Sequence, residues 1–177
     1  VSTTQHWLPV YDHPSDKATY SIRFKVPPGY VIATNGRTLE VPTPDTLTET
    51  VWATSSKFPI ATYLLTFAMG KFKTTNVASR YLPKSIEFVV YYLPQYEDAA
   101  IHSFKNFHHT FFAFQNRFGR YPFEKIGFVL VPFSAGAMEH QTMITMPQVA
   151  ILNLFQSQDT VNLLAAHEFA HQWFGNY

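Results

Sequence analysis

The hydrophobic periodicity of the chain changes near residue 80, and this change limits the folds that the chain can adopt. In residues 18–30, "ATYSIRFKVPPGY", large apolar residues alternate with polar ones, as is typical of a strand with one buried face. Pro27, Pro28 and Gly29 then favour a turn, because two fixed φ angles precede a residue that readily adopts positive φ. Short strands and frequent turns continue to about residue 75 and predict an all-β domain, either a sandwich or a saddle-shaped sheet.

Asn35-Gly36 is a strong turn signal in this part of the chain, and it predicts a hairpin between strands at residues 30–34 and 37–41. A break in strand structure is expected at the Ser, Lys and Pro residues of 55–59. The remaining strands of the all-β domain are expected on either side of that break, at residues 47–54 and 61–69.

The second part of the chain has the patterns of helices and buried strands. Six apolar residues recur at spacings of three and four and predict one helix that ends at Gly119: Ala100, Phe104, Phe107, Phe111, Phe114 and Phe118. Continuous apolar runs predict further strands, at residues 85–94, 125–132 and 147–155. A last helix is expected from about Thr160 to Phe174, with Asp159 as its N-cap and Gly175 as its stop.

The expected fold class is therefore α+β, with a domain boundary in the segment 75–82, "NVASRYLP" for residues 76–83. We predict a first domain at residues 1–80 and a second at residues 81–177. The aromatic share of 17% predicts a large aromatic core. A net charge of +1 gives no electrostatic basis for binding nucleic acid, and no apolar run in this segment is long enough to span a membrane. The absence of cysteine excludes disulfides and Cys-based zinc sites, and the compartment is left open.

The segment "AAHEFAHQWFGN" near the end of the chain contains the pattern H-E-x-x-H, formed by His167, Glu168 and His171. On a helix, residues i and i+4 lie on one face, so both imidazoles can reach one zinc ion. Glu168 is rotated by about 100° from His167 along the helix and lies beside the ion, where it can accept a proton from a metal-bound water. Zinc lowers the pKa of such a water to about 7, so hydroxide would be present at neutral pH.

A chance occurrence of the pattern, with both histidines packed in a core, is the alternative interpretation. The two imidazoles also make an incomplete site, because catalytic zinc usually has three protein ligands and a water. No obvious third ligand is found among the six other histidines, which are His6, His13, His102, His108, His109 and His140.

The segment "SAGAMEHQT" at residues 134–142 follows a predicted buried strand. It contains Glu139, a lone carboxylate after the uncharged residues Val129 to Met138. A carboxylate on a strand near a metal can pair with the ammonium group of a substrate. An exposed strand edge can also pair with an extended peptide. The alternative is an ordinary glutamate at the surface.

"GAMEH" at 136–140, "HEFAH" at 167–171 and "QWFGN" at 172–176 together resemble the zinc aminopeptidases typified by aminopeptidase N, which are gluzincin metallopeptidases. The opening "WLPVYDHPSDKATYSIRFKVPPGYVIATNG" and the later "TYLLTFAMGKF" resemble the N-terminal β-domain of the same family. The resemblance covers nearly the whole chain. It implies an N-terminal β-domain followed by the first part of a thermolysin-like catalytic domain.

The resemblance also implies a role for each residue of the motifs. His167 and His171 would bind one zinc ion per enzyme, Glu168 would be the general base, and Glu139 would bind the free N-terminal amine of a peptide substrate. An amine held at a fixed distance from the metal would leave only the first peptide bond within reach. The rest of the substrate-binding segment would be Gly136, Ala137, Met138 and His140, the first two of them along the peptide backbone.

The sequence departs from the family pattern at His140, where asparagine is usual. Imidazole is larger than the asparagine amide and can carry charge near neutral pH, so the local geometry and pH response would differ. In the family, a glutamate that is the third zinc ligand and a tyrosine that stabilises the intermediate would lie beyond Tyr177, and a second acidic residue would precede Val1. We therefore expect a fragment that is inactive by itself and in which zinc can be absent.

Two other functions remain open at this stage. An enzyme like the leukotriene hydrolases shares these motifs and also opens an epoxide. A non-catalytic module that binds peptides would keep the fold without the chemistry, although a scaffold has no need of Glu168. The motifs leave open the preferred N-terminal residue, the oligomeric state and the physiological metal, because cobalt or manganese can occupy such a site.

Overall fold

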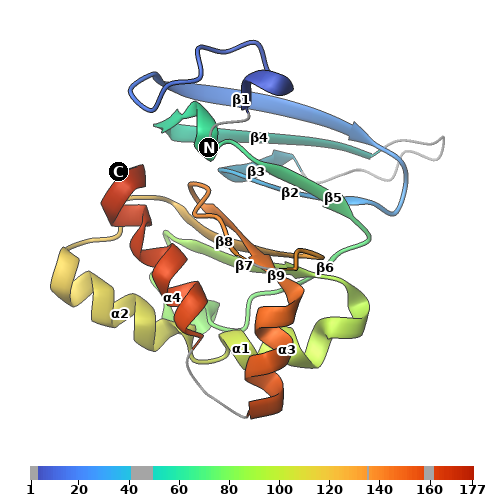
Figure 1. Ribbon diagram of the computed structural model, residues 1–177, viewed down its shortest axis with the longest axis vertical. Helices are drawn as coiled ribbons and strands as arrows, with labels where there is room; N and C mark the ends of the chain where they lie inside the picture. Colours follow the sequence, from blue (N-terminus) through green and yellow to red (C-terminus); the bar gives the residue numbers. More distant parts are fainter. Residues whose placement is uncertain (1–3, 41–49, 135, 158–161) are drawn as a thin grey trace.

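The strands form three sheets, two of which are built from the first 70 residues (Figure 1). The computed structural model describes residues 4–40, 50–134, 136–157 and 162–177. The first sheet has the antiparallel order β1-β4-β3, made of β1 (Lys17–Val26), β4 (Thr50–Ala61) and β3 (Arg37–Glu40). The second pairs β2 (Val31–Thr34) with β5 (Phe67–Gly70). Short 3₁₀ turns lie at Thr4–His6, Thr62–Leu64, Ser79–Tyr81 and Pro94–Tyr96.

Strand β1 confirms the predicted alternation. Tyr20, Ile22 and Phe24 are half-buried, Val26 is buried, and the intervening residues are exposed. One face of β1 therefore packs inward while the other contacts solvent.

The predicted hairpin at Asn35-Gly36 is wrong. Strand β2 pairs with β5 and strand β3 pairs with β4, so the chain passes from one sheet to the other at this turn. Gly36 has the positive φ of 71° that the turn signal predicts. The side chain of Asn35, however, is buried and binds backbone outside the two strands, with Nδ2 donating to Leu64 O at 2.9 Å and Oδ1 accepting from Thr66 N at 2.7 Å. The turn thus joins two sheets instead of two paired strands.

The predicted break at 55–59 is also wrong, because β4 continues through it to Ala61. The register with β1 shifts here: Ala18 is opposite Ile60, whereas Tyr20 is opposite Ser56. Pro59 therefore lies at a bulge, where a strand tolerates a residue without an N–H group. Of the strand predicted at 61–69, only the last part is a strand, β5, because a 3₁₀ turn occupies Thr62–Leu64.

The third sheet has the order β6-β7-β8-β9 and is built from the second part of the chain. Its strands are β6 (Lys73–Thr75), β7 (Glu87–Tyr92), β8 (Lys125–Val131) and β9 (Met143–Pro147). Strands β7, β8 and β9 are parallel and β6 is antiparallel to β7. The strands predicted at 85–94 and 125–132 are confirmed. The boundary near residue 80 stays a prediction, although β6, which precedes it, hydrogen-bonds to β7.

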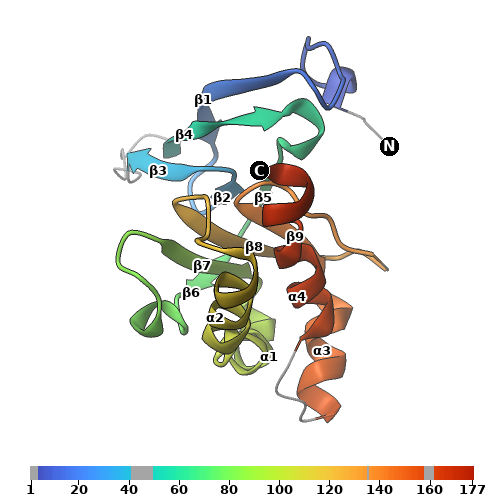
Figure 2. The same cartoon turned by 90° about the vertical axis from the view of Figure 1, so that its left-hand side faces the viewer.

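In the part of the chain that the structure describes, four α-helices cover one face of this sheet, on the side away from the first two sheets (Figure 2). They are α1 (Glu97–Phe104), α2 (Phe107–Phe118), α3 (Gln148–Ser157) and α4 (Leu163–Ala170). The single aromatic helix of the prediction is in fact two helices, α1 and α2, because the backbone leaves helical geometry at Asn106 (φ −103°, ψ 9°). Gly119, with φ of 91°, ends α2 as predicted.

The segment 147–155 is helix α3 and not the predicted strand. A short apolar run does not distinguish a buried strand from a buried helix, and here Pro147 ends β9 and leads directly into the helix. Helix α4 has Asn162 as its N-cap, since Asn162 Oδ1 accepts from Ala165 N at 2.9 Å. The predicted N-cap, Asp159, lies outside the described residues.

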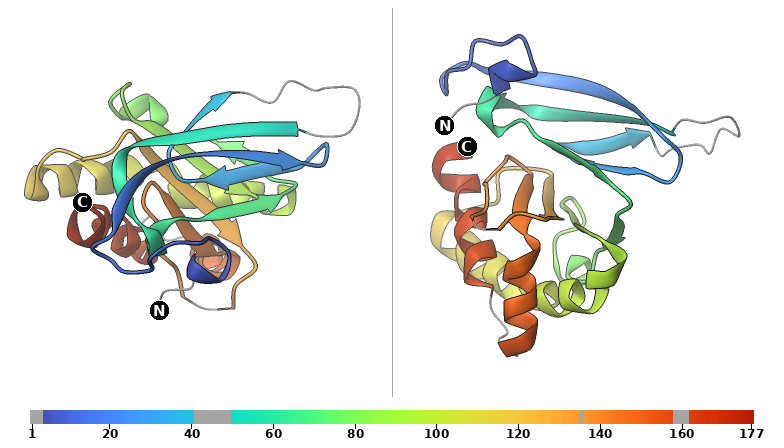
Figure 3. Two further views of the ribbon diagram at one scale, coloured as in Figure 1. Left: turned by 90° about the horizontal axis from the view of Figure 1, so that it is seen from above. Right: turned by 45° about the vertical axis from the view of Figure 1, so that its right-hand side comes forward.

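The third sheet is buried on both faces, which explains its continuous apolar runs. Phe88, Phe128 and Ile144 face the helices and pack with Phe104, Phe107 and other aromatic side chains of the main core. Opposite faces of the same strands pack against β2 and β5 (Figure 3), in a cluster of Ala33, Val89, Tyr91, Val129, Val131 and Met143. The aromatic core that the composition predicts is confirmed. Among the described residues, no helix combines the length and apolar character needed to cross a bilayer.

Candidate active site

His167 and Glu168 of the H-E-x-x-H pattern lie in the last turn of α4, and His171 is the C-cap residue with helical φ and ψ, so the pattern has the helical context that was predicted. Glu168 is buried, at 5% exposed, whereas His171 is half-buried and His167 is exposed. The ring centroids of His167 and His171 are 5.0 Å apart, with the ring planes nearly perpendicular. The two imidazoles therefore lie next to each other, one helical turn apart.

Three candidate ligand groups converge beside this helix. One side-chain donor atom each of Glu139, Glu168 and His171 lies within 4.8 Å of the other two, although Glu139 comes from the loop between β8 and β9. Among the described residues, His167 is not part of this group of three. The fold thus brings Glu139 next to Glu168, 29 positions later in the chain, and so unites the two segments that the sequence singled out.

The imidazole of His171 is oriented by the backbone that follows it. His171 Nδ1 is 3.1 Å from Phe174 O, and since a carbonyl can only accept, Nδ1–H is the donor. Nε2 then carries the lone pair. A histidine held in this way by a backbone carbonyl is typical of a metal ligand, so the residues present suit a divalent cation such as zinc.

Burial raises the pKa of Glu168, and the nearby carboxylate of Glu139 adds to the increase. The two histidines of the motif act in the opposite direction. A positive charge nearby would therefore stabilise the ionised form of Glu168 and lower its pKa again.

The loop between β8 and β9 brings Glu139 to the helix by adding an edge to the third sheet. Met138 forms an isolated antiparallel bridge with Thr145 of β9, with both N–H···O distances at 2.9 Å. Gly136 is exposed with φ of 80°, and Ala137 packs against the main core. Met138 therefore pairs with the outer edge of β9, and the role of residues 136–139 in peptide binding stays a prediction.

The wide turn after α4, η5 (Gln172–Asn176), fixes the backbone of Glu139. Glu139 O accepts from Gln172 Nε2 at 3.2 Å and from Asn176 Nδ2 at 2.7 Å. Both lone pairs of this carbonyl are thereby used. Gln172 and Asn176 belong to the "QWFGN" segment that resembles the family, but the sequence assigns no role to either; their only signal is their position next to the histidine motif.

His140 is half-buried and contacts strand β9. Its Nδ1 is 3.0 Å from Thr145 Oγ1, and burial lowers its pKa to about 4. The imidazole is therefore neutral near pH 7 and does not carry the positive charge that a histidine at this position could have.

The first part of the chain also reaches this site, which the sequence did not indicate. The pKa of Tyr63 is raised by burial and, to a smaller extent, by the carboxylate of Glu139. Tyr63 and Met138 pack against the same apolar cluster, which includes Leu64. Asn35 Nδ2 donates to Gln141 O at 2.6 Å, two residues after Glu139.

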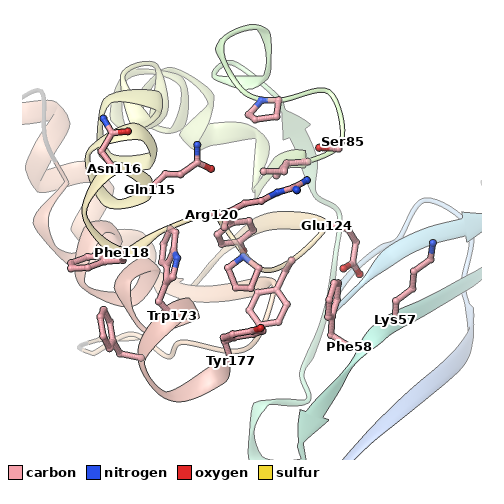
Figure 4. Close-up of a pocket in the computed structure, with 16 residues that line it drawn as sticks. Lys57, Phe58, Ser85, Gln115, Asn116, Phe118, Arg120, Glu124, Trp173 and Tyr177 are labelled. Atoms are coloured by element: carbon pink, nitrogen blue, oxygen red, sulfur yellow. The ribbon is translucent and has the colours of Figure 1, made fainter.

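A hollow of about 1100 Å³ opens elsewhere, beside the C-terminal turn and the start of β8 (Figure 4). Its lining includes Phe118, Arg120, Trp173 and Tyr177, and none of the three converging groups lines it. The chemistry that Glu139, Glu168 and His171 offer therefore lies outside this hollow.

The profile of the "Peptidase family M1 domain" matches residues 88–177. With half of the chain matched and with the fold and motifs described above, the chain belongs to peptidase family M1. The family resemblance seen in the sequence is thus confirmed.

Similar curated proteins are aminopeptidases. Glutamyl aminopeptidase of Sus scrofa is 30% identical over 177 residues, glutamyl aminopeptidase of Bitis rhinoceros 32% over 185 residues, and puromycin-sensitive aminopeptidase of Caenorhabditis elegans 29% over 183 residues. Each alignment covers 96% of this chain but only 18% of the relative. The chain therefore spans less than a fifth of the length of these relatives.

Solved structures of the family share the fold. The M1 zinc metallopeptidase from Deinococcus radiodurans matches with a TM-score of 0.71 at 23% identity, over 99% of this chain and 38% of that chain. A mutant of a two-domain M1 zinc metallopeptidase bound to L-tryptophan matches with a TM-score of 0.77 at 25% identity, over 98% of this chain and 38% of that chain. The expected α+β class is confirmed as the fold of the N-terminal part of M1 metallopeptidases.

Proposed function

We propose that this chain belongs to a zinc aminopeptidase that hydrolyses the first peptide bond of substrates with a free N-terminus. The observation that carries the proposal is the convergence of Glu139, Glu168 and His171 donor atoms within 4.8 Å. Membership of family M1 and similarity to three aminopeptidases support it.

His171, through Nε2, and His167 would hold the zinc ion. His167 is exposed, so its side chain can rotate towards the ion without repacking the core. When bound, zinc would act as a Lewis acid that polarises the scissile carbonyl and acidifies water.

Glu168 would be the general base of the reaction. Its buried carboxylate lies within 4.8 Å of a His171 ring nitrogen and would take a proton from the attacking water and pass it to the leaving amine. No other carboxylate of the motif helix can do this, because Glu168 is the only acidic residue of α4.

Glu139 would pair with the substrate's ammonium group and so determine which bond is cleaved. Because its backbone is held by the turn after α4, the distance from the amine to the metal would be fixed, and only the first peptide bond would be presented. Gly136 and Ala137 would follow the substrate backbone, and Met138 and His140, which both contact Thr145 of β9, would complete the substrate-binding segment.

The 177-residue chain alone is expected to be inactive, because it spans only 18% of the length of the aminopeptidases it resembles. Activity is therefore to be measured on the full-length protein that carries this chain.

The proposal is tested with chromogenic amino-acid amides, before and after removal of metal with a chelator. Cleavage should require metal and return when zinc is restored. Glu168→Gln should keep zinc and lose about 10²- to 10⁴-fold in kcat, the range for loss of a general base. Loss of zinc in this variant would show that Glu168 is a ligand instead.

Glu139→Ala provides the second arm. It should raise KM for peptides with a free N-terminus while zinc content is unchanged. Equal cleavage of N-acetylated and free peptides by the wild-type protein would contradict the anchoring role. A protein that binds peptides but shows no metal-dependent cleavage would be the non-catalytic module that shares this fold.

A further inference from the structure

Thr142 has an unusual backbone conformation close to the candidate active site. Its φ is +62°, and among the described residues it is the one non-glycine position with positive φ. A β-branched residue rarely adopts this region, because its Cβ substituents crowd the backbone. Thr142 is also 2% exposed. Strain of this kind persists only where the surrounding structure holds the residue in place.

Three different elements hold Thr142. Its Oγ1 accepts from Gly36 N of the β2–β3 turn at 2.8 Å, and its carbonyl accepts from Gly127 N of β8 at 3.0 Å. Its own N–H donates to Oε1 of Gln172, after α4, at 3.0 Å. The strained residue is therefore fixed by the β2–β3 turn, by the third sheet and by the turn η5 after α4.

The side chain of Gln172 connects this residue to Glu139. Gln172 is 1% exposed, and its amide group accepts from Thr142 N with Oε1 while it donates to Glu139 O with Nε2 at 3.2 Å. One amide thus binds both ends of the four-residue segment 139–142. Since Gln172 directly follows His171, the segment is held against the same turn that carries a candidate metal ligand.

We propose that Thr142 and Gln172 are positioning residues that fix the Glu139 carboxylate relative to Glu168 and His171. The proposal rests on the proposed aminopeptidase function, in which Glu139 holds the substrate amine. Without these hydrogen bonds, Thr142 would relax to negative φ and the segment 139–142 would shift. A shift of about 1 Å at a group that orients the substrate is enough to cost up to 10²-fold in rate.

The test uses the full-length protein and matched variants. Gln172→Met removes both hydrogen bonds of the amide at similar volume. Thr142→Val removes the hydroxyl and keeps the shape, and Thr142→Ser keeps the hydroxyl. The control is Thr4→Val, because Thr4 is also buried, at 3% exposed, and its side-chain hydrogen bond to Thr62 O, at 2.9 Å, involves neither the segment 139–142 nor Gln172.

The first readout does not depend on activity. Hydrogen–deuterium exchange of a peptide that covers residues 136–146 should be at least about tenfold faster in Gln172→Met and Thr142→Val than in the wild type, since the protecting hydrogen bonds are lost. Thr4→Val and Thr142→Ser should leave that exchange unchanged.

The second readout is kinetic, with zinc content measured alongside. For a free N-terminal substrate, KM should rise about tenfold or more in Gln172→Met and Thr142→Val at unchanged zinc content, while Thr142→Ser restores the wild-type value. A merely structural role would lower activity in proportion to the folded fraction, as in Thr4→Val, without changing KM.

The outcomes separate the two proposals. Unchanged exchange of 136–146 in Gln172→Met and Thr142→Val, or a KM change no larger than that of Thr4→Val, would overturn the positioning role. Loss of zinc along with the KM change would also overturn it, because the two residues would then support the metal ligands. A wild-type protein that lacks aminopeptidase activity refutes the proposed function, while the exchange experiment still decides whether Thr142 and Gln172 hold the segment.

Discussion

Lys125 is a buried lysine at the first position of β8, 1% exposed, where a strand end would ordinarily leave it in solvent. Its Nζ donates to Thr34 O at 3.0 Å and to Gly36 O at 2.8 Å, which joins the second part of the chain to the β2–β3 turn. Burial lowers its pKa to about 8, and the carboxylates of Glu87 and Glu124 partly oppose that decrease. A neutral amine can still donate both hydrogen bonds.

We expect this lysine to make stability rise with pH. Between about pH 8 and the unfolded pKa near 10.4, the unfolded chain binds more protons than the folded one, so the free energy of unfolding increases with pH. The full effect is about 3 kcal/mol. The window closes near pH 10, because burial raises the pKa values of Tyr91 and Tyr121 and their contribution has the opposite sign.

Urea unfolding at several pH values in this window measures the slope. Lys125→Met, which has no titratable group, should flatten it. A wild-type slope equal to that of Lys125→Met would show that Lys125 keeps an ordinary pKa.

At the scale of single residues, the sequence revealed what is local. The pattern of His167, Glu168 and His171 is visible because one helix and its C-cap residue supply all three, and Glu139 was found through a second family motif. Lys125, Thr142 and Gln172 were not found, because their roles depend on contacts between segments 15 to 106 residues apart. No local pattern encodes such a contact.

At the scale of elements, periodicity predicted the type of most strands and helices but not their partners. Strands β1, β7 and β8 were identified correctly, since each has a long or regular pattern. Helix α4 was also expected, but it ends at Ala170 and the wide turn η5 follows, so the predicted end at Phe174 with Gly175 as the stop was wrong. The hairpin at Asn35-Gly36 failed because a two-residue turn can also join strands of different sheets. The strand assigned to α3 failed because its apolar residues are buried in either conformation.

The close approach of β8 to the loop before β9 gives a prediction at this scale. A Cβ at Gly127 would lie 2.6 Å from Met143 Cε and 2.8 Å from Thr142 O. Gly127→Ala should therefore destabilise the protein by about 1–3 kcal/mol, the usual cost of overpacking. Thermal or urea unfolding measures the loss.

Adding Met143→Ala distinguishes the two contacts. This change removes the clash with the thioether but leaves the one with the carbonyl of Thr142, so Gly127→Ala should still destabilise a Met143→Ala background. If the double variant were as stable as Met143→Ala alone, the clash would come only from the flexible Met143 side chain.

At the scale of the whole molecule, the third sheet depends on the first part of the chain. The face formed by Val89, Tyr91, Val129 and Val131 is covered by β2 and β5, and further polar contacts come from Asn35 and Lys125. A sheet with one apolar face uncovered exposes a surface that favours aggregation.

Residues 81–177 produced alone should therefore aggregate or bind the dye ANS, whereas the 177-residue chain should not. Near-UV circular dichroism and dye fluorescence compare the two proteins at equal concentration. A soluble 81–177 segment with a native-like near-UV spectrum would show that the β2–β5 layer is dispensable for folding.

The position of β2 and β5 in the chain also affects how the protein folds during synthesis. Strands β2 and β5 precede β7, β8 and β9 in the chain, so a ribosome releases the cover before the sheet that needs it. Each newly emerged parallel strand can then dock on an existing apolar surface. The order of the sequence thereby shortens the time for which the most aggregation-prone segments of the nascent polypeptide lack a partner.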